Sequence, residues 1–188
     1  MNLVIDVGNT FAKVALFEGA SMLHQEAFDK DEIVIQLLKI QKKYKVSNAI
    51  ISSVANLLQD DLAKIEKLFP VHVLNATSKV SFKNDYATPK TLGVDRIALA
   101  AAAKNQYPNQ NVLVIDAGTC ITFDFMDNTG VYKGGAISPG VQMRFKAMHT
   151  FTDKLPLIKN IENIALIGDS TETSMQSGVI NGVVAEIN

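Results

Sequence analysis

Cysteine, tryptophan and long apolar runs are scarce in this chain of 188 residues. Cys120 is its one cysteine, and it has no tryptophan. A single thiol excludes an internal disulfide framework and is typical of proteins in a reducing compartment. No apolar run approaches the ~20 residues of a membrane-spanning helix. The first residues, which include Asp6 and Asn9, lack the basic and apolar regions of a signal peptide. We therefore expect a cytoplasmic protein with no membrane partner.

An excess of charge of either sign is also missing. The net charge of −1 offers no attraction to nucleic acid, so we expect no nucleic-acid partner. The lysine-rich segment 39–45 is interpreted as a solvated helix face. His24, His72 and His149 lie far apart, which excludes a recognisable metal-ligand spacing. The GxxxxGK(S/T) and GxGxxG nucleotide loops are absent as well, so a nucleotide site would need another arrangement.

A short sequence motif occurs twice. LVIDVG begins at Leu3 and LVIDAG begins at Leu113, 110 positions later. An apolar strand that ends in Asp-x-Gly places a carboxylate at the edge of a sheet, before a turn where backbone amides can approach an anion. One copy is a weak signal, because Asp and Gly are ordinary turn residues. Two copies at corresponding positions favour a phosphate clamp made of a first turn (residues 6–10) and a second turn (residues 116–119).

The side chains of both turns suit a nucleotide triphosphate. Hydroxyl and amide groups that can donate to phosphate oxygens come from Asn9, Thr10 and Thr119. Lys13 follows the first turn and could point back at the phosphates. Asp6 and Asp116 would stay ionised and hold a cation, directly or through water, that neutralises the triphosphate.

Strand and helix signals alternate along the chain. Strands are expected at 2–7, 11–18, 21–28, 48–54, 71–75, 111–118, 120–125, 131–138 and 164–168. Helices are expected from Asp31 to about residue 44, at 57–69 and 91–106, from Pro139 to 151, and at 168–188 with a cap at Asp169 or Ser170. Residues 76–90 are expected to form a loop. The order predicts an α/β protein with two similar halves, residues 1–110 and 111–188.

Five segments resemble one family. They are DVGNTFAKVALFEG, YATPKTLGVDRIALAAAA, DAGTCITFDF, GGAISPG followed by KLP, and GDSTETSMQSG. Together they are similar to type III pantothenate kinase, the bacterial enzyme family that begins coenzyme A synthesis, within the actin, hexokinase and sugar-kinase superfold. The resemblance implies two actin/ribonuclease H-like halves with mixed sheets flanked by helices. Because family members continue beyond the position of Asn188, it also predicts that the second half is incomplete.

The resemblance implies a role for individual residues. The first phosphate motif corresponds to Asp6, Gly8, Asn9, Thr10 and Lys13, and the second to Asp116, Gly118 and Thr119. Asp116 is expected near a monovalent cation, potassium or ammonium, and Mg²⁺-ATP is the expected phosphate donor. Asp95 corresponds to the general base. The expected pantothenate pocket comprises Tyr86, Gly93, Arg96 and Thr171, with Thr171 supplied by the partner subunit of a homodimer whose active site lies at the interface.

Other interpretations remain open. Asp95 and Arg96 could be a surface pair at a helix start, where Asp also interacts favourably with the helix dipole. A fixed guanidinium such as that of Arg96 nevertheless suits the carboxylate of pantothenate. At the level of function, the alternatives are a non-catalytic regulatory relative of the same fold, and a phosphatase or other phosphotransferase of the superfold.

Overall fold

The computed structural model describes residues 1–8, 11–53, 59–162 and 164–188. It divides into two compact units. The first unit comprises Met1–Val112 and Met126–Lys133, and the second comprises Leu113–Phe125 and Gly134–Asn188. These two units are defined by contacts in space. The two halves predicted from the sequence repeat, residues 1–110 and 111–188, are a different division and stay a prediction.

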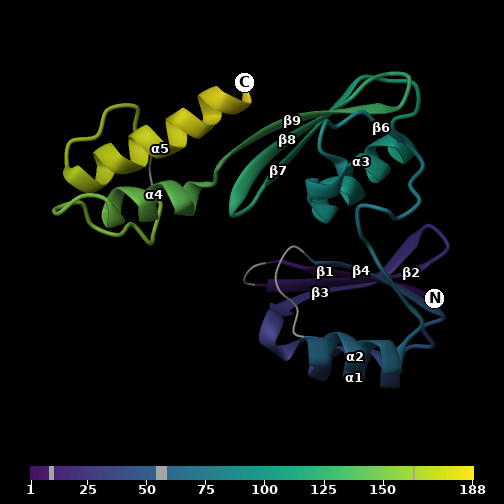
Figure 1. The fold of residues 1–188 in the computed structure, drawn as a ribbon. Coiled ribbons are helices and arrows are strands. Elements are labelled where there is room, and N and C mark those ends of the chain that lie inside the picture. Colours follow the sequence, from purple (N-terminus) through teal and green to yellow (C-terminus); the bar gives the residue numbers. More distant parts are fainter. Residues whose placement is uncertain (9–10, 54–58, 163) are drawn as a thin grey trace. The chain divides into compact units, whose positions relative to one another are not determined.

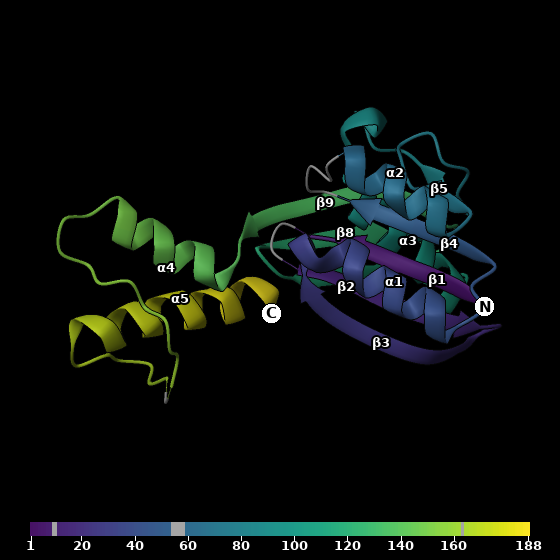
Figure 2. The ribbon, with the colours of Figure 1, turned by 90° about the horizontal axis from the view of Figure 1, so that it is seen from below.

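The first unit contains a five-stranded mixed sheet (Figure 1). Its strand order is β3-β2-β1-β4-β5 (Figure 2). Its strands are β1 Asn2–Val7, β2 Phe11–Glu18, β3 Ser21–Asp29, β4 Asn48–Ser53 and β5 Val71–Val73. β1, β2 and β3 pair antiparallel, whereas β4 runs parallel to β1 and β5 runs parallel to β4. The strands expected near the start of the chain are therefore confirmed, with their ends shifted by a few residues.

One face of this sheet is covered by two helices. A short 3₁₀ helix, Lys30–Glu32, leads into α1 Ile33–Lys43, and α2 Gln59–Leu68 lies beside α1 (Figure 2). Alternate residues of β1 and β2 point to the helices because side chains in a strand alternate between faces. Buried α1 residues recur at helical spacing and complete the core. The core includes Leu3, Ile5, Val7, Val14, Ile33, Leu37, Ile40, Ile51 and Ile65. This packing turns the other face of the sheet, which carries Asp6, away from α1 and α2.

The rest of the first unit surrounds α3 Val94–Gln106. Its buried residues are Phe82, Leu92, Ile97, Ala100, Met126 and Tyr132. The expected loop at 76–90 contains a two-residue strand, β6 Lys83–Asn84, which pairs in parallel with β9 Val131–Pro139. Periodicity cannot reveal such a strand, because two residues contain no repeat. Its position depends on a partner strand far along the chain.

A second sheet has the strand order β6-β9-β8-β7. β7 Val112–Ala117 and β8 Cys120–Met126 flank the second turn. In the second unit, α4 Val141–Thr150 and α5 Thr171–Ile187 pack around Phe145, Ile158, Met175 and Val179. The structure thus confirms an α/β protein with mixed sheets flanked by helices.

Two details of the second unit differ from the sequence-based expectation. Residues 164–168, expected as a strand, form no strand, and Leu166 and Ile167 are 80% and 84% exposed. An apolar run forms a strand only where a neighbouring strand pairs with it. Pro139 was expected in the first turn of a helix, but it ends β9, and α4 begins at Val141. The residue between them, Gly140, is the helix cap.

The start of α5 follows the expectation. Ser170 is the cap residue, and its hydroxyl accepts a hydrogen bond from the Thr173 backbone N–H. The Thr173 hydroxyl completes a capping box by accepting from the Ser170 backbone N–H at 2.9 Å. Asp169 also contributes, because its carboxylate accepts from the Thr173 hydroxyl at 3.1 Å. These bonds satisfy amides that a helix start leaves without intrahelical partners. Among the described residues, no helix is long and apolar enough to cross a membrane.

Candidate active site

The first turn follows β1, and its carboxylate belongs to a row of polar side chains. Asp6 lies opposite Lys13 in the antiparallel pair of β1 and β2, and beside Ser52 in the parallel pair of β1 and β4. Side chains at paired positions lie on the same face of a sheet. Lys13, Asp6 and Ser52 therefore form one row across three strands, which we call the polar row. At the turn itself, the Gly8 N–H donates to the Phe11 carbonyl at 2.9 Å.

Burial increases along the polar row. Lys13 is exposed, Asp6 is half-buried and Ser52 is only 8% exposed. An ammonium and a carboxylate at paired positions can together serve a phosphate and its counter-cation. Two further predicted residues of this turn, Asn9 and Thr10, lie outside the described residues. Ser52 was not identified from the sequence. Only the pairing of β1 with β4, which the structure shows, places this residue next to Asp6.

The second turn, between β7 and β8, rests against the start of a helix. The Gly118 N–H donates to the Cys120 carbonyl at 2.9 Å, and the Thr119 carbonyl accepts from the Gly140 N–H at 3.0 Å. A Cβ atom on Gly140 would collide with the carbonyl oxygens of Gly118 and Thr119, so only glycine permits this approach. Asp116, Gly118 and Thr119 are all exposed. The N-terminus of α4 adds a partial positive charge that favours an anion near this turn.

Four predicted residues come together at the start of α3. Gly93 is the cap residue of α3, and the Asp95 Oδ1 accepts from the Arg96 backbone N–H at 2.8 Å. The Arg96 guanidinium lies over the Tyr86 ring, 5.6 Å from its centroid. A Cβ atom on Gly93 would collide with the Asp95 carboxylate. We call Tyr86, Gly93, Asp95 and Arg96 the α3 site.

Burial distinguishes the two charged groups of the α3 site. Arg96 is only 5% exposed and Asp95 is half-buried. Arg96 is therefore no member of a surface pair, and that alternative is wrong for this residue. The Asp95 Oδ1 accepts from the Arg96 backbone N–H in the first turn of the helix. A backbone amide therefore orients this half-buried carboxylate.

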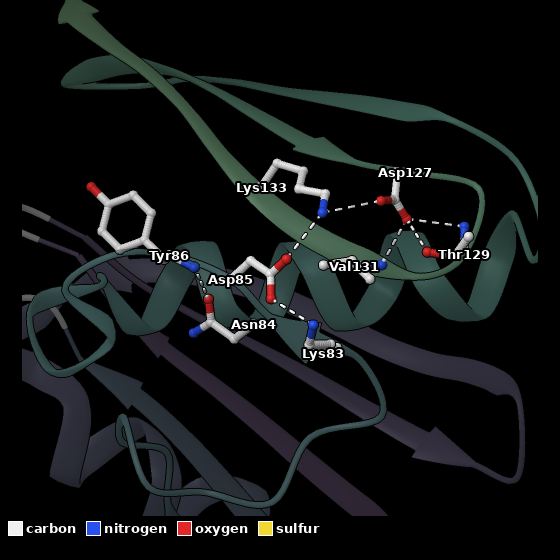
Figure 3. Close-up of polar contacts among 8 residues, drawn as sticks. All are labelled: Lys83, Asn84, Asp85, Tyr86, Asp127, Thr129, Val131 and Lys133. Atoms are coloured by element: carbon white, nitrogen blue, oxygen red, sulfur yellow. Dashed lines mark hydrogen bonds and ion pairs between the residues drawn. The ribbon is translucent and has the colours of Figure 1, made fainter.

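Tyr86 is held by the short strand β6 that precedes it. Its backbone N–H donates to the Asn84 Oδ1 at 2.9 Å (Figure 3). Its ring centroid lies 6.1 Å from that of the buried Tyr132. The Lys83 N–H donates to the Gly130 carbonyl at 3.1 Å, and the Asp85 N–H donates to the Tyr132 carbonyl at 3.0 Å. The wall of the α3 site therefore depends on the pairing of β6 with β9.

Ion pairs reinforce this pairing on the surface. The Asp85 carboxylate lies 3.0 Å from the Lys83 Nζ through Oδ1 and 3.0 Å from the Lys133 Nζ through Oδ2. The Lys133 Nζ also lies 3.4 Å from the Asp127 Oδ2. Figure 3 shows these side chains converging between β6 and β9. We call the four residues the β6 network. No sequence signal indicated it, because it joins residues from distant parts of the chain.

The network changes the pKa values of its members. Hydrogen bonds from Lys133 and then Lys83 lower the pKa of Asp85, and the same contact with Asp85 raises the pKa of Lys133. The pKa of Asp127 falls to about 2, chiefly because the Thr129 hydroxyl and the Val131 N–H donate to its carboxylate. Both carboxylates are therefore ionised near neutral pH, as the ion pairs require.

The remaining predicted residue, Thr171, is the exposed first residue of α5 in the second unit. The first turn and the α3 site belong to the first unit, and the second turn and Thr171 belong to the second. Among the described residues, no group of three or more His, Cys, Asp or Glu side chains could hold a metal ion. A cation at either turn would therefore complete its coordination with phosphate oxygens and water, as Mg²⁺ commonly does.

A cavity of about 500 Å³ in the first unit has no part in this arrangement. It lies at the opposite end of β1 from Asp6 and is lined by Asn2, Val4, Ile50 and His72, among others. None of the predicted site residues lines it.

Comparison with known proteins identifies the family of this chain and agrees with its fold. The family model of type III pantothenate kinase matches residues 2–188. The chain is 50% identical over 188 residues to a type III pantothenate kinase of Christiangramia forsetii, covering 100% of this chain and 77% of the relative. It is 46% identical over 189 residues to the type III pantothenate kinase of Flavobacterium johnsoniae, covering 100% of this chain and 78% of the relative. The chain belongs to the type III pantothenate kinase family.

A solved structure shows a similar fold. It is that of a Campylobacter jejuni protein described as a Baf family transcriptional activator. The TM-score is 0.61 at 22% sequence identity, and the match covers 98% of this chain and 77% of the other. At that identity the similarity concerns the fold alone.

Proposed function

We propose that this protein phosphorylates pantothenate with ATP, which gives 4′-phosphopantothenate and ADP in the first step of coenzyme A synthesis. Membership of the type III pantothenate kinase family supports this proposal. The observation that carries it in the structure is the α3 site, where adjacent residues supply a half-buried, oriented carboxylate and a buried guanidinium. The carboxylate suits the proton of the pantothenate hydroxyl, and the guanidinium suits the carboxylate of pantothenate.

Asp95 is the proposed general base. A bond forms between the pantothenate hydroxyl oxygen and the γ-phosphorus, and the bond from the γ-phosphorus to the oxygen bridging to the β-phosphorus breaks. The hydroxyl proton passes to the Asp95 Oδ2, while Oδ1 keeps its bond to the Arg96 N–H. Most of the acceleration in such transfers comes from alignment and charge neutralisation, with the base orienting the nucleophile.

Arg96 is the proposed partner of the pantothenate carboxylate. The Tyr86 ring holds the guanidinium plane through a cation–π contact. Because Arg96 is already ordered, it loses less conformational entropy when the substrate binds. The missing Cβ at Gly93 makes room for the Asp95 carboxylate in its observed position. Thr171 would contribute to the pocket from the partner subunit of a homodimer, as the family resemblance implies.

The nucleotide phosphates are assigned to the two turns. Asp6, Gly8 and Lys13, with Asn9 and Thr10, would hold one side, and Gly118 and Thr119 would hold the other. Asp6 is the proposed ligand of Mg²⁺, which would neutralise the phosphate charge when bound. Asp116 is the proposed ligand of potassium or ammonium. One carboxylate at each turn fits cations that draw their other ligands from phosphate and water.

A coupled assay of ADP release with and without pantothenate tests the proposal. We expect ADP to form only when pantothenate is present, together with one 4′-phosphopantothenate per ADP. Hydrolysis of ATP that does not depend on pantothenate would instead indicate a phosphatase or another phosphotransferase. A folded protein that binds but does not turn over either substrate would indicate a regulatory relative.

A further inference from the structure

The buried hydroxyl of Ser52 is the least explained polar group near the first turn. Ser52 is 8% exposed, and its Oγ atom is buried without a hydrogen-bond partner among the residues that the structure describes. Native proteins leave few buried polar atoms unsatisfied, because such an atom has lost its water without gaining a partner. An alanine at this position of β4 would avoid that cost.

The position of Ser52 indicates what the hydroxyl could bind. Ser52 and Asp6 are paired residues of β4 and β1 and lie on the same face of the sheet. Neighbouring strands are separated by about 4.8 Å, a distance that a serine and an aspartate side chain can together span with a hydrogen bond. An ionised carboxylate only accepts hydrogen bonds, and a serine hydroxyl can donate one.

We propose that Ser52 is a positioning residue for Asp6, whose carboxylate accepts the Ser52 hydroxyl when Mg²⁺-ATP occupies the first turn. The inference rests on the proposed function of that turn. Hydrogen bonds from a second residue commonly orient a carboxylate that binds a metal ion, and losing them weakens metal affinity. Ligand binding would then give this hydroxyl the partner that it lacks among the described residues.

This role predicts two effects of opposite sign for Ser52→Ala. In the free protein the substitution removes an unsatisfied buried hydroxyl, so the melting temperature should rise by about 2–4 °C for a chain of this size. In the complex it removes a hydrogen bond to a charged group, so the Kd of Mg²⁺-ATP should increase roughly tenfold. If Ser52 had only a structural role, its substitution would not raise the melting temperature of the free protein and at the same time weaken the binding of Mg²⁺-ATP.

The experiment uses the full chain and two measurements, thermal unfolding without ligand and calorimetric titration with Mg²⁺-ATP. Ser52→Thr keeps the hydroxyl and should bind Mg²⁺-ATP within about twofold of the wild type. Ser47→Ala is the matched control, because Ser47 is exposed just before β4, at the end of the strand opposite Ser52. It should leave both the melting temperature and the Kd unchanged.

Three results would count against the inference. Equal Mg²⁺-ATP affinity of wild type and Ser52→Ala would overturn it, and so would a lower melting temperature of free Ser52→Ala, which would mean that the hydroxyl is already satisfied. A loss of affinity in Ser52→Thr as large as that in Ser52→Ala would show that the hydroxyl is not the group that matters. If the wild type itself bound no Mg²⁺-ATP, the failure would lie with the proposed function of the first turn.

Discussion

The two Asp-x-Gly turns share a sequence motif but have different surroundings. Asp6 is half-buried between Lys13 and Ser52 in the middle of a five-stranded sheet. Asp116 is exposed, and its turn rests on Gly140 at the start of α4. The third residue of the strand after the turn is Lys13 in the first case and Thr122 in the second. The two turns therefore share a strand and a turn, but their neighbouring residues differ in charge.

From this difference we infer that the two turns bind different cations. An ammonium and a carboxylate side by side suit the highly charged end of a nucleotide with its divalent cation. A lone exposed carboxylate beside a helix N-terminus suits a weaker cation and one side of the phosphates. The predictions below test this comparison, beginning with the largest expected effect.

Asp95→Ala should affect the chemical step but not the binding of ATP at the two turns. Loss of a general base should lower kcat by roughly 10²–10⁴-fold. Both turns keep their residues, so the Kd of Mg²⁺-ATP should stay within about twofold of wild type. Steady-state kinetics and calorimetry measure the two quantities, and Asp153→Asn, at an exposed carboxylate, is the control. Unchanged turnover of Asp95→Ala would rule out its role as base.

Asp6→Asn and Asp116→Asn compare the turns directly. We expect kcat/KM for ATP to fall roughly 10²-fold for Asp6→Asn and about tenfold for Asp116→Asn, because only Asp6 has the ammonium of Lys13 at its paired position. Mg²⁺ titrations should shift mainly for Asp6→Asn, and potassium or ammonium titrations mainly for Asp116→Asn. Equal losses of kcat/KM in both variants, with the same ion dependence, would contradict the proposal that the two turns bind different cations.

Glycine substitutions test how tightly each turn is packed. A Cβ on Gly140 meets two backbone carbonyls that cannot rotate away, whereas a Cβ on Gly8 would lie 3.2 Å from the Phe11 carbonyl. Gly140→Ala should destabilise the protein by about 1–3 kcal/mol, and Gly8→Ala by about 1 kcal/mol or less. Urea unfolding followed by circular dichroism measures both. The reverse order of stabilities would contradict the packing described for the second turn.

Acid should weaken ion-paired segments in both units. The pKa of Asp127 lies near 2 instead of its usual 3.8, so its contribution to stability is present above pH ~4 and disappears as the pH falls towards 2. In the second unit, Glu186 behaves similarly, because Ser138 and then Arg144 lower its pKa. Asp127→Asn should unfold with a shallower pH dependence between pH 4 and 2. An acid-unfolding curve identical to that of the wild type would show that the Asp127 carboxylate does not contribute to stability.

Local sequence patterns predicted the elements that bury a periodic face. Leu3, Ile5 and Val7 alternate as a strand requires, and Ile33, Leu37 and Ile40 recur at helical spacing, so β1 and α1 were expected where they occur. The same reasoning was wrong for 164–168, because apolar composition does not create a partner strand. It also missed β6, whose two residues are held in place only by β9.

The sequence by itself determined most of the strands and helices and the two Asp-x-Gly motifs, since these depend on residues close together in the chain. Only the tertiary structure decided that Ser52 lies beside Asp6, that Arg96 is buried under Tyr86, and that Lys133 reaches Asp85 from 48 residues away. The physical reason is that burial and the pairing of polar groups depend on contacts between distant segments. A periodic pattern specifies which face of an element is apolar, but not which other segment covers it.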